Sequence, residues 1–419
     1  MSDLRPHSRR SLRSPTLARH GRLKRSNSFT TLAKVLAGAL AVMFVSGVSV
    51  AGIATFSLAD AAQPTVHLAS EKTAGPIPQI GAIDGGVNLL LVGSDSRKGQ
   101  DPAFGGEDET GDLNDVTMLL HISQDHSNVS VISFPRDMFV AIPECPDPSG
   151  GTFDSMSRQK INTTLTYGGL PCTVLTVEKL TGLSIPFAAE IQFGGVIAMS
   201  NAVGGVPVCV AEKIEDEYTG TFLEPGEHTL SGVDALQFLR TRHGVGDGSD
   251  LTRISNQQVF LSSLVRTIKS AETLTNPVKL YSLAKAALGN MTLSDSLANV
   301  DRMVSIALAL KDIDLNKIVF VQYPTGSTEG GVQPLTAAAD ALDAALLADQ
   351  PISLSGDTGG SVADPNAPAD PAVPADPNAT AAPADPNATA APTTALPSTV
   401  KGQTAGQYTC SNGRSLEDQ

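Results

Sequence analysis

The sequence predicts an α/β fold: a single three-layer α-β-α domain with a central mixed sheet, preceded by one N-terminal transmembrane helix and followed by a disordered Pro/Ala-rich tail. Two observations support this prediction. Short apolar runs alternate with segments of helical periodicity through the middle of the chain, and a basic arm is followed by a long uncharged run. We expect these boundaries: 1–34 basic cytoplasmic arm, 35–58 transmembrane helix, 59–85 stalk, 86–350 α/β domain, 351–400 low-complexity linker and 401–419 Cys-containing segment.

The N-terminal arm and the run after it predict a membrane anchor. Residues 1–34 hold nine Lys/Arg and one acid, whereas the whole chain has a net charge of −14. Val35–Leu58 is 24 residues without a charge, which is long enough to cross a bilayer as a helix. The basic arm keeps the N-terminus in the cytoplasm and exports the rest. A cleaved signal peptide ending near Ala59-Asp60-Ala61 is the alternative. A DNA-binding regulator is disfavoured, because the arm has one aromatic residue and no helix-turn-helix pattern.

The α/β domain is predicted from two kinds of periodicity. Apolar runs bounded by glycine or polar loops predict strands at Val87–Val92, Val116–Ile122, Val129–Phe134, Phe187–Ile191, Val206–Val210 and Lys317–Gln322. Helical spacing of apolar residues predicts helices at Ile161–Tyr167, Cys172–Leu180, Gly194–Ala202, Ser231–Leu239 and Asp250–Ile268, with further helix in residues 273–312. The repetitive stretch Ser361–Pro397 has almost no large apolar side chains and predicts a flexible spacer.

The four cysteines indicate disulfides. In an exported domain they favour disulfides over a zinc site, since no C-x-x-C spacing occurs. Four cysteines allow three pairings. Cys145 and Cys172 are nearest in sequence and are the preferred pair, which leaves Cys209 with Cys410.

Ala235–Gln258 concentrates arginine in a chain that otherwise uses it sparingly. Arg240 and Arg242 alternate, so an extended chain would point both side chains to one face. Arg253 follows after a Gly-rich loop. A guanidinium grips a phosphate with two parallel hydrogen bonds, and a group of them suits a pyrophosphate. We interpret the stretch as an anion clamp; the alternative is a solvated helix end and loop.

Two aspartates follow or open predicted strands. Asp95 lies in the loop Gly93–Arg97 after the first strand, and Asp115 opens the second. Arg136 closes the third strand. Ligands gather at such strand ends, and two carboxylates with phosphate oxygens suit Mg²⁺. The alternatives are turn or cap residues, and a surface ion pair of Arg136 with Asp137.

Seven motifs in order then resemble a known family. They are VNLLLVGSDSR, NDVTMLLHI, SFPRDM, INTTLTYGG, NAVGGVPVCV, LSGVDALQFLRTR and DLTRISNQQ, from Val87 to about Ser270. Together they resemble the LytR–CpsA–Psr (LCP) family, the wall-glycopolymer ligases of Gram-positive bacteria. The anchor, the Ala-rich composition and the Pro/Ala tail look actinobacterial.

The resemblance implies a phosphotransferase at the cell membrane, single-pass, with its catalytic domain on the extracellular side. It would take a polyprenyl-pyrophosphate-linked glycopolymer and join it to peptidoglycan through a phosphodiester. Teichoic-acid-like, arabinogalactan and capsular polymers all stay open. By family motif, Asp95 and Asp115 would hold Mg²⁺, Arg97, Arg136, Arg240, Arg242 and Arg253 would be catalytic, and Gln257 and Asp250 would bind substrate. No nucleic acid partner is expected.

The sequence departs from the family at one position. The family usually has a basic residue two places before its second metal-binding Asp, where this chain has Leu113. Lys98 could replace that contact. Asp250 could be a general base or a helix cap. The lipid needs an apolar slot, and the candidates, which could equally be ordinary core, are Phe193, Val196, Ile197, Met199, Val259, Phe260 and Leu264.

Two other functions use the same features. A pyrophosphatase would hydrolyse the lipid carrier with water in place of the sugar hydroxyl. A non-catalytic wall-binding or regulatory membrane protein would need neither the arginines nor the aspartates for chemistry.

Overall fold

The computed structural model describes residues 28–61, 63–76, 82–97, 100, 112–270, 277–365 and 393–419. It separates into two compact units, Met1–Ser57 and Leu58–Gln419. Helix α1 spans Ser28–Ala61. No helix in the described part of the chain is both long enough and apolar enough to cross a membrane. The transmembrane helix over Val35–Leu58 therefore stays a prediction, and residues 1–27 of the basic arm lie outside the described residues.

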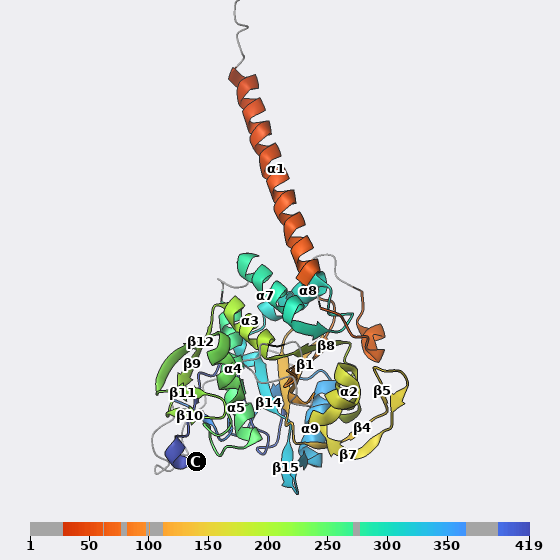
Figure 1. Cartoon of the computed structure of the whole chain (residues 1–419), viewed down its shortest axis with the longest axis vertical. Helices are drawn as coiled ribbons and strands as arrows, with labels where there is room; N and C mark the ends of the chain where they lie inside the picture. The colour runs from red at the N-terminus through yellow and green to blue at the C-terminus, as the bar shows by residue number, and fades with distance from the viewer. Residues whose placement is uncertain are drawn as a thin grey trace, which may run out of the picture. The chain divides into compact units, whose positions relative to one another are not determined.

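A seven-stranded mixed sheet lies at the centre of the second unit (Figure 1). Its order is β13-β8-β1-β2-β3-β14-β20. Strand β1 runs parallel to β8, and β3 runs parallel to β14, while the other neighbours are antiparallel. The mixed α/β class with a central mixed sheet is thus confirmed. The strands are β1 Val87–Ser94, β2 Asn114–Ile122, β3 Val129–Phe134, β8 Phe187–Ile191, β13 Met291–Leu293, β14 Ile318–Gln322 and β20 Gly402–Thr404.

Helices cover both faces of this sheet, which explains why its strands are apolar without strict alternation. Leu90 and Val92 of β1 belong to one core, whereas Leu89 and Leu91 contact the other. The first core is closed by α2 (Thr164–Thr181) and α9 (Thr336–Leu347). The second is closed by α5 (Asp250–Lys269), α7 (Pro277–Asn290) and α8 (Val300–Lys311).

A third core lies beside the main sheet and supports the arginine-rich segment. It is formed by α4 (Gly232–Arg240), one side of α5 and a four-stranded sheet. Phe238 of α4 packs against Phe260 of α5, with ring centroids 6.2 Å apart. Helix α3 (Phe193–Val203) packs near α4 and α7. The four strands are β12 Gly226–Leu230, β9 Val206–Val210, β21 Cys410–Ser411 and β18 Val362–Ala363.

In the described part of the chain, fifteen strands were not predicted from the sequence, and all of them are short. Five of these, β12, β13, β18, β20 and β21, are given above. The other ten are β4 Phe139–Ile142, β5 Cys145–Pro146, β6 Thr152–Phe153, β7 Met156–Lys160, β10 Ile214–Asp216, β11 Thr221–Leu223, β15 Thr325–Thr328, β16 Gly331–Pro334, β17 Ile352–Ser353 and β19 Thr394–Ala395. Short 3₁₀ turns occur at Ala69–Thr73, Ile161–Thr163, Leu315–Lys317 and Leu416–Asp418. Few of these strands carry an apolar/polar alternation, so periodicity gave no signal. Helix in 273–312 is interrupted by β13, and 271–276 lie outside the described residues.

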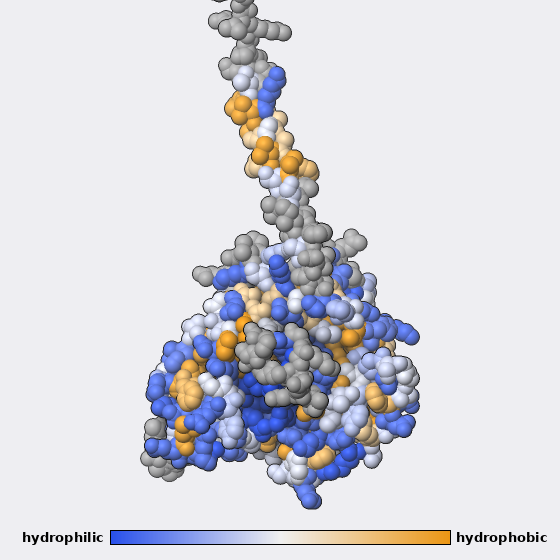
Figure 2. Space-filling view, in the orientation of Figure 1, coloured by the Kyte–Doolittle hydropathy of each residue, from blue (hydrophilic) through white to orange (hydrophobic). Residues whose placement is uncertain are grey.

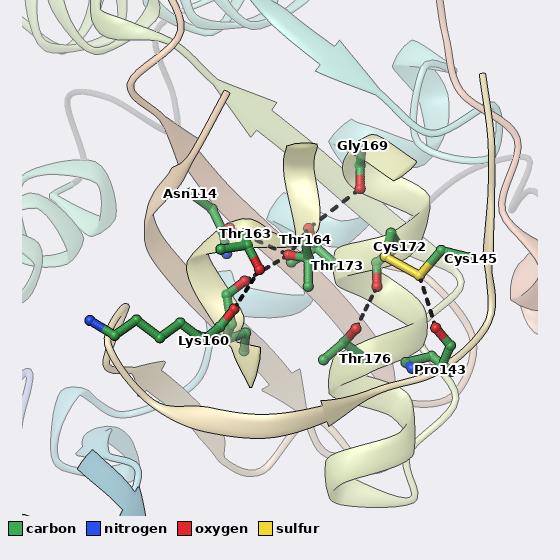
Figure 3. Close-up of a disulfide and its surroundings, with 11 residues drawn as sticks. Asn114, Pro143, Cys145, Lys160, Thr163, Thr164, Gly169, Cys172, Thr173 and Thr176 are labelled. Carbon is green, nitrogen blue, oxygen red and sulfur yellow. Dashed lines mark hydrogen bonds between the residues drawn. A yellow bond between two sulfur atoms is a disulfide. The ribbon is translucent and has the colours of Figure 1, made fainter. Parts of the chain in front are cut away.

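The break predicted between two helices at Gly168 is confirmed, because α2 consists of two helical parts separated by non-helical backbone at Gly168 and Gly169. Gly169 has a φ of 67°, a conformation that glycine adopts at little cost. A side chain at Gly168 would come within 2.7 Å of the Pro146 carbonyl oxygen. The hydroxyls of Thr164 and Thr173 hydrogen-bond across the kink at 2.8 Å (Figure 3).

Both preferred disulfides are confirmed. Cys145–Cys172 links the β5–β6 hairpin to α2 directly after its kink (Figure 3). Cys209–Cys410 joins positions 201 residues apart and attaches the C-terminal segment to β9.

The predicted linker 351–400 is structured at both ends. Strand β17 pairs with β19, and Leu396 and Val400 are buried in the first core. Beyond the linker, β20 extends the central sheet beside β14. The expectation of a disordered tail is therefore wrong for the described parts, while residues 366–392 lie outside them. Because the repeat has so few large apolar residues, those near its end, Leu396 and Val400, were not predicted to be buried.

The predicted stalk contacts the same unit. Leu68 and Ile83 are buried, and the Arg302 guanidinium donates to the carbonyls of Ala74 and Gly75 at 3.0 and 3.1 Å.

Replacing Cys209 and Cys410 together by serine should lower the stability of the domain by about 2–5 kcal/mol, because the disulfide closes a long loop in the unfolded chain. Calorimetry measures the loss, and limited proteolysis should release the segment 393–419 earlier than in the wild type. Equal melting temperatures and equal proteolysis would contradict this role.

Asp343 gives the fold a pH dependence. Burial raises the pKa of this α9 carboxyl to about 6, although the Tyr323 hydroxyl donates to it at 2.9 Å. Because the folded-state pKa is raised, its stabilising contribution is present below about pH 4 and is lost as pH rises through about 6. Asp343→Asn should therefore stabilise the protein by about 1–2 kcal/mol at pH 7.5, after allowance for solvent screening, and not at pH 4. Thermal melts at the two pH values test this, with the exposed Asp154→Asn as control; equal shifts at both would contradict it.

Candidate active site

Asp95 is fixed at the end of β1 by the chain that leads into β2. Its backbone N–H donates to the Leu113 carbonyl at 3.1 Å, and its carboxylate accepts from the Leu113 N–H at 2.9 Å. Leu113, at the position where the family usually has a basic residue, thus contributes through its backbone. Burial raises the pKa of Asp95, and the nearby charge of Asp115 raises it further. Lys98 lies outside the described residues.

Asp115 joins two arginines from distant parts of the chain. The Arg136 guanidinium donates to its carboxylate. Arg253 donates to its backbone carbonyl at 2.6 Å and lies 3.9 Å from its carboxylate. The preceding residue, Asn114, is fully buried and hydrogen-bonds Thr117 at 2.7 Å, which fixes the start of β2.

Asp250 is a second acid that orders these arginines. Its carboxylate accepts from the Arg136 backbone N–H at 3.1 Å and lies 2.6 Å from the Arg253 guanidinium. The helix cap is Ser249, whose side chain accepts from the Thr252 N–H at 3.3 Å. The interpretation of Asp250 as the cap is therefore wrong, since the serine before it takes that role.

Arg240 and Arg242 enter the site from the end of α4. Arg240 is the last helical residue, and its guanidinium carbon lies 4.3 Å from the centre of the Phe193 ring. Thr241 is extended and fully buried, and its hydroxyl donates to Asp216 at 2.7 Å. Burial lowers the pKa of both arginines, and the positive charge of Arg253 lowers each further.

The arginines form one cluster with unused donors. Within the described residues, the Nε atoms of Arg136, Arg242 and Arg253 are buried without a hydrogen-bond partner. Arg97 lies close enough to lower the pKa of Arg240. Buried donors without partners are costly, so this arrangement favours an anionic ligand. Gln257 is held beside the cluster by its bond to the Leu239 carbonyl at 2.9 Å.

The alternative for Arg136, an ion pair with Asp137, is also present in the structure. The Arg136 Nε lies 3.6 Å from the Asp137 carboxylate, which also accepts a hydrogen bond from Lys160 at 2.8 Å. The hydrogen bond of the Arg136 guanidinium goes to Asp115, so Arg136 pairs with both acids.

A cavity of about 220 Å³ opens beside this cluster. Asp115, Arg240 and Arg253 line its polar side. Ser94, Gln192, Ser200 and Gln257 also line it, and the other lining residues are glycine or apolar. These include five of the seven predicted lipid-lining residues: Phe193, Val196, Met199, Phe260 and Leu264. Ile197 and Val259 are not among the lining residues, and Val259 is buried in the third core.

Several residues of the site were missed by sequence reasoning. Asp216 holds the segment after Arg240, and Asn114 anchors Asp115. Phe193 was expected only to border the lipid, and its role in supporting Arg240 was missed. Glu190, at the end of β8, has a pKa raised by burial despite a hydrogen bond with Ser94. Each acts through a contact between distant segments, so no local pattern marks it; only the strand-end position of Glu190 was a usable signal.

The donor set at Asp95 and Asp115 fits a divalent cation of the Mg²⁺ type. The charge of Asp115 is close enough to raise the pKa of Asp95, and two carboxylates supply the hard oxygen ligands that Mg²⁺ takes in small number. Among the described residues, the group of three possible metal ligands is His67, Glu71 and Asp295, which does not include either aspartate.

Comparisons with known proteins were made for sequence and structure. The chain is 29% identical to the cell wall biosynthesis protein LcpA of Corynebacterium glutamicum over 273 residues, 59% of this chain and 52% of the relative. It is 32% identical to the probable cell wall biosynthesis protein LcpB of the same organism over 277 residues, 62% and 63% of the two chains. It is 27% identical over 302 residues to the polyisoprenyl-teichoic acid–peptidoglycan teichoic acid transferase TagT of Bacillus subtilis, 68% and 88%. The chain therefore matches only about half of LcpA and less than two thirds of LcpB.

Two solved structures share the fold. A LytR-Csp2A-Psr enzyme from Actinomyces oris aligns with a TM-score of 0.50 at 23% identity, over 68% of this chain and 96% of that one. Bacillus subtilis TagV aligns with a TM-score of 0.50 at 20% identity, over 64% and 98%. At these identities the likeness shows the fold alone. The family model of the LytR_cpsA_psr family matches residues 55–347, which holds both aspartates and all five arginines of the site, and the chain belongs to this family.

Proposed function

We propose that this protein transfers a glycopolymer from a polyprenyl-pyrophosphate carrier to peptidoglycan, as a phosphotransferase. The observation that carries the proposal is the arginine cluster at the polar side of an apolar cavity. A lipid pyrophosphate has the same two halves, a dianionic head and a greasy tail. The relative TagT is named as a transferase of polyisoprenyl-linked teichoic acid, which supports this substrate class.

The proposed reaction forms one phosphorus–oxygen bond and breaks another. A sugar hydroxyl of peptidoglycan attacks the phosphorus that bears the glycopolymer, and the bond to the second phosphate breaks. Polyprenyl phosphate leaves, the hydroxyl proton is lost, and a phosphodiester joins polymer to wall. Phosphoryl transfer of this kind needs positioning and positive charge more than covalent help from the protein.

The arginines supply that charge from a low-dielectric setting. Arg136 and Arg253 are fixed by Asp115 and Asp250, so their remaining donors are already oriented before the substrate arrives. Arg240 and Arg242 have pKa values lowered by burial, which means that their charged forms lack full compensation. A pyrophosphate would provide it, and would do so most strongly as charge builds on the leaving phosphate.

Asp95 and Asp115 are the residues that would hold Mg²⁺. When bound, the cation neutralises charge on the phosphate oxygens. Asp115 would still keep Arg253 in place through its backbone carbonyl. Its carboxylate, which already accepts from Arg136, would be shared between Arg136 and the cation.

The cavity would receive the first isoprene units of the carrier. Its apolar lining continues from Phe193 and Leu239 to Leu264 and Ile268. Phe193 has two roles in this proposal, since its ring both supports Arg240 and borders the lipid.

We further propose that α1 anchors the protein in the cell membrane, with the catalytic domain in a three-layer α-β-α arrangement outside. Large apolar side chains along the described part of α1 are exposed (Figure 2), among them Phe29, Leu36, Met43 and Phe44. Exposure of that apolar surface to water is unfavourable, whereas lipid would remove it from water. The basic arm favours a cytoplasmic N-terminus.

Arg240→Gln should lower kcat/KM for polymer transfer by about 30- to 1000-fold, or about 2–4 kcal/mol, because a preorganised donor to the developing negative charge is lost. The assay supplies purified full-length protein with lipid-linked polymer and peptidoglycan, and measures polymer joined to the wall. Arg414→Gln is the matched control, since Arg414 bonds the Asp418 carbonyl instead. Full activity of Arg240→Gln would contradict the proposal.

The same assay without peptidoglycan separates transfer from hydrolysis. A transferase releases little free polymer until the wall acceptor is added. If the wild type instead releases polymer at the same rate with and without acceptor, the protein is a pyrophosphatase.

Removing Mg²⁺ with EDTA should abolish transfer, and added Mg²⁺ should restore it. Asp95→Asn should raise the Mg²⁺ concentration for half-maximal activity at least about tenfold, because a neutral amide oxygen binds a hard cation more weakly. Mn²⁺ binding followed by electron paramagnetic resonance provides a readout independent of turnover. Asp147→Asn, in an exposed turn, is the control, and an unchanged metal response in Asp95→Asn would rule out this site.

A further inference from the structure

An exposed aromatic ring lies in a turn whose backbone is linked through Asp216 to the backbone of Arg242, and it has no role in the proposed chemistry so far. Tyr218, in the turn between β10 and β11, is 80% exposed. One face of its ring leans on the His243 ring, with centroids 4.5 Å apart and planes inclined by 37°.

The Tyr218 turn is tied to the arginine segment by one buried carboxylate. Asp216 is fully buried, and one of its oxygens accepts from the N–H groups of Tyr218 and Thr219 at 3.0 and 3.3 Å. Its other oxygen accepts from the N–H groups of Arg242 and His243 at 3.0 and 3.2 Å. Burial alone would raise the pKa of Asp216, but these bonds and the Thr241 hydroxyl hold it below its ordinary value. The Asp216 carboxylate therefore links the backbone of the turn to the backbone of Arg242 and His243.

Two further features fix the backbone of the turn. Gly220 has a φ of 72°, and a side chain there would come within 2.9 Å of the Gln237 side chain of α4. The hydroxyls of Thr219 and Thr221 bond each other at 2.7 Å across the turn. Tyr218 is thus presented by a fixed backbone, which reduces the entropy lost when a ligand covers its ring.

The surroundings of the ring decide which ligand fits. Glu217, directly before it, is exposed, so a second anion is disfavoured there. The lipid cavity is lined by other residues, and Tyr218 is not among them. A neutral, hydroxylated ligand with one apolar face fits an exposed ring beside an acidic residue. A pyranose ring has this form, because its axial C–H groups lie against the electron-rich face of an aromatic ring while its hydroxyls stay in water or bond nearby acids.

We propose that Tyr218, backed by His243, is a stacking platform for a sugar ring adjoining the pyrophosphate. The sugar is either the first sugar of the donor polymer or the acceptor sugar of peptidoglycan; both share the pyranose chemistry. This inference rests on the proposed function, and it assigns the platform the task of placing a sugar beside Arg242.

The test measures equilibrium binding to the full-length protein in detergent, which needs no turnover. Three probes are used: a polyprenyl pyrophosphate that carries one sugar, the same lipid without sugar, and a soluble peptidoglycan fragment. Tyr218→Ala should weaken binding of one sugar-bearing probe about five- to tenfold, while the sugar-free lipid binds as before. Tyr218→Phe, which keeps the ring, should bind like the wild type. Tyr408→Ala, at a half-exposed tyrosine of the C-terminal segment, is the control.

Each outcome decides the proposal. Loss confined to the sugar-bearing lipid assigns the platform to the donor, and loss confined to the peptidoglycan fragment assigns it to the acceptor. Unchanged binding of both, an equal loss for the sugar-free lipid, or a Tyr218→Phe variant as weak as Tyr218→Ala would overturn it. Failure of the proposed function appears separately, as a wild type that binds these probes but joins no polymer to peptidoglycan.

Discussion

The ion pairs of Asp115 are the interaction on which the site depends. Like charges repel, and Arg136 and Arg253 come from elements more than a hundred residues apart in sequence. Asp115 brings them together, and Asp250 secures both from the other side through the Arg136 backbone and the Arg253 side chain. Breaking a partly buried network of this kind leaves uncompensated charge, so the two acids are as necessary to the site as the arginines.

The network satisfies part of the positive charge and leaves the rest for a ligand. Arg240 gains the face of Phe193 rather than a full carboxylate partner, and its pKa is lowered by burial. Within the cluster, the Nε atoms of Arg136, Arg242 and Arg253 are buried without hydrogen-bond partners in the described structure. A fold keeps such a cost only when the surrounding structure enforces it, and here the third core and the Cys209–Cys410 disulfide hold α4, α5 and β9 in place. The same packing leaves the apolar cavity open beside the charges.

The residues of this site that lie at the ends of regular strands could be predicted from the sequence. Asp95, Asp115 and Arg136 stand at the ends of apolar strands, and such ends meet at one edge of a sheet. The residues that could not be predicted take their roles from contacts between distant segments. Asp216 looks like any turn acid until the loop at Thr241 packs on it. Asp and Ser are both preferred at a helix N-cap, so the sequence alone could not tell whether Ser249 or Asp250 caps α5. The described ends of the 351–400 linker are structured because β17 pairs with β19 and because Leu396 and Val400 pack into the first core, contacts that no local pattern reveals.

A structure of the protein with a polyprenyl pyrophosphate bound tests the central claim most directly. The account predicts phosphate oxygens within hydrogen-bond distance of the Nε atoms of Arg136, Arg242 and Arg253, and isoprene units in the cavity between Phe193 and Leu264. A lipid bound elsewhere, or a pyrophosphate that leaves these three Nε atoms without partners, would contradict it.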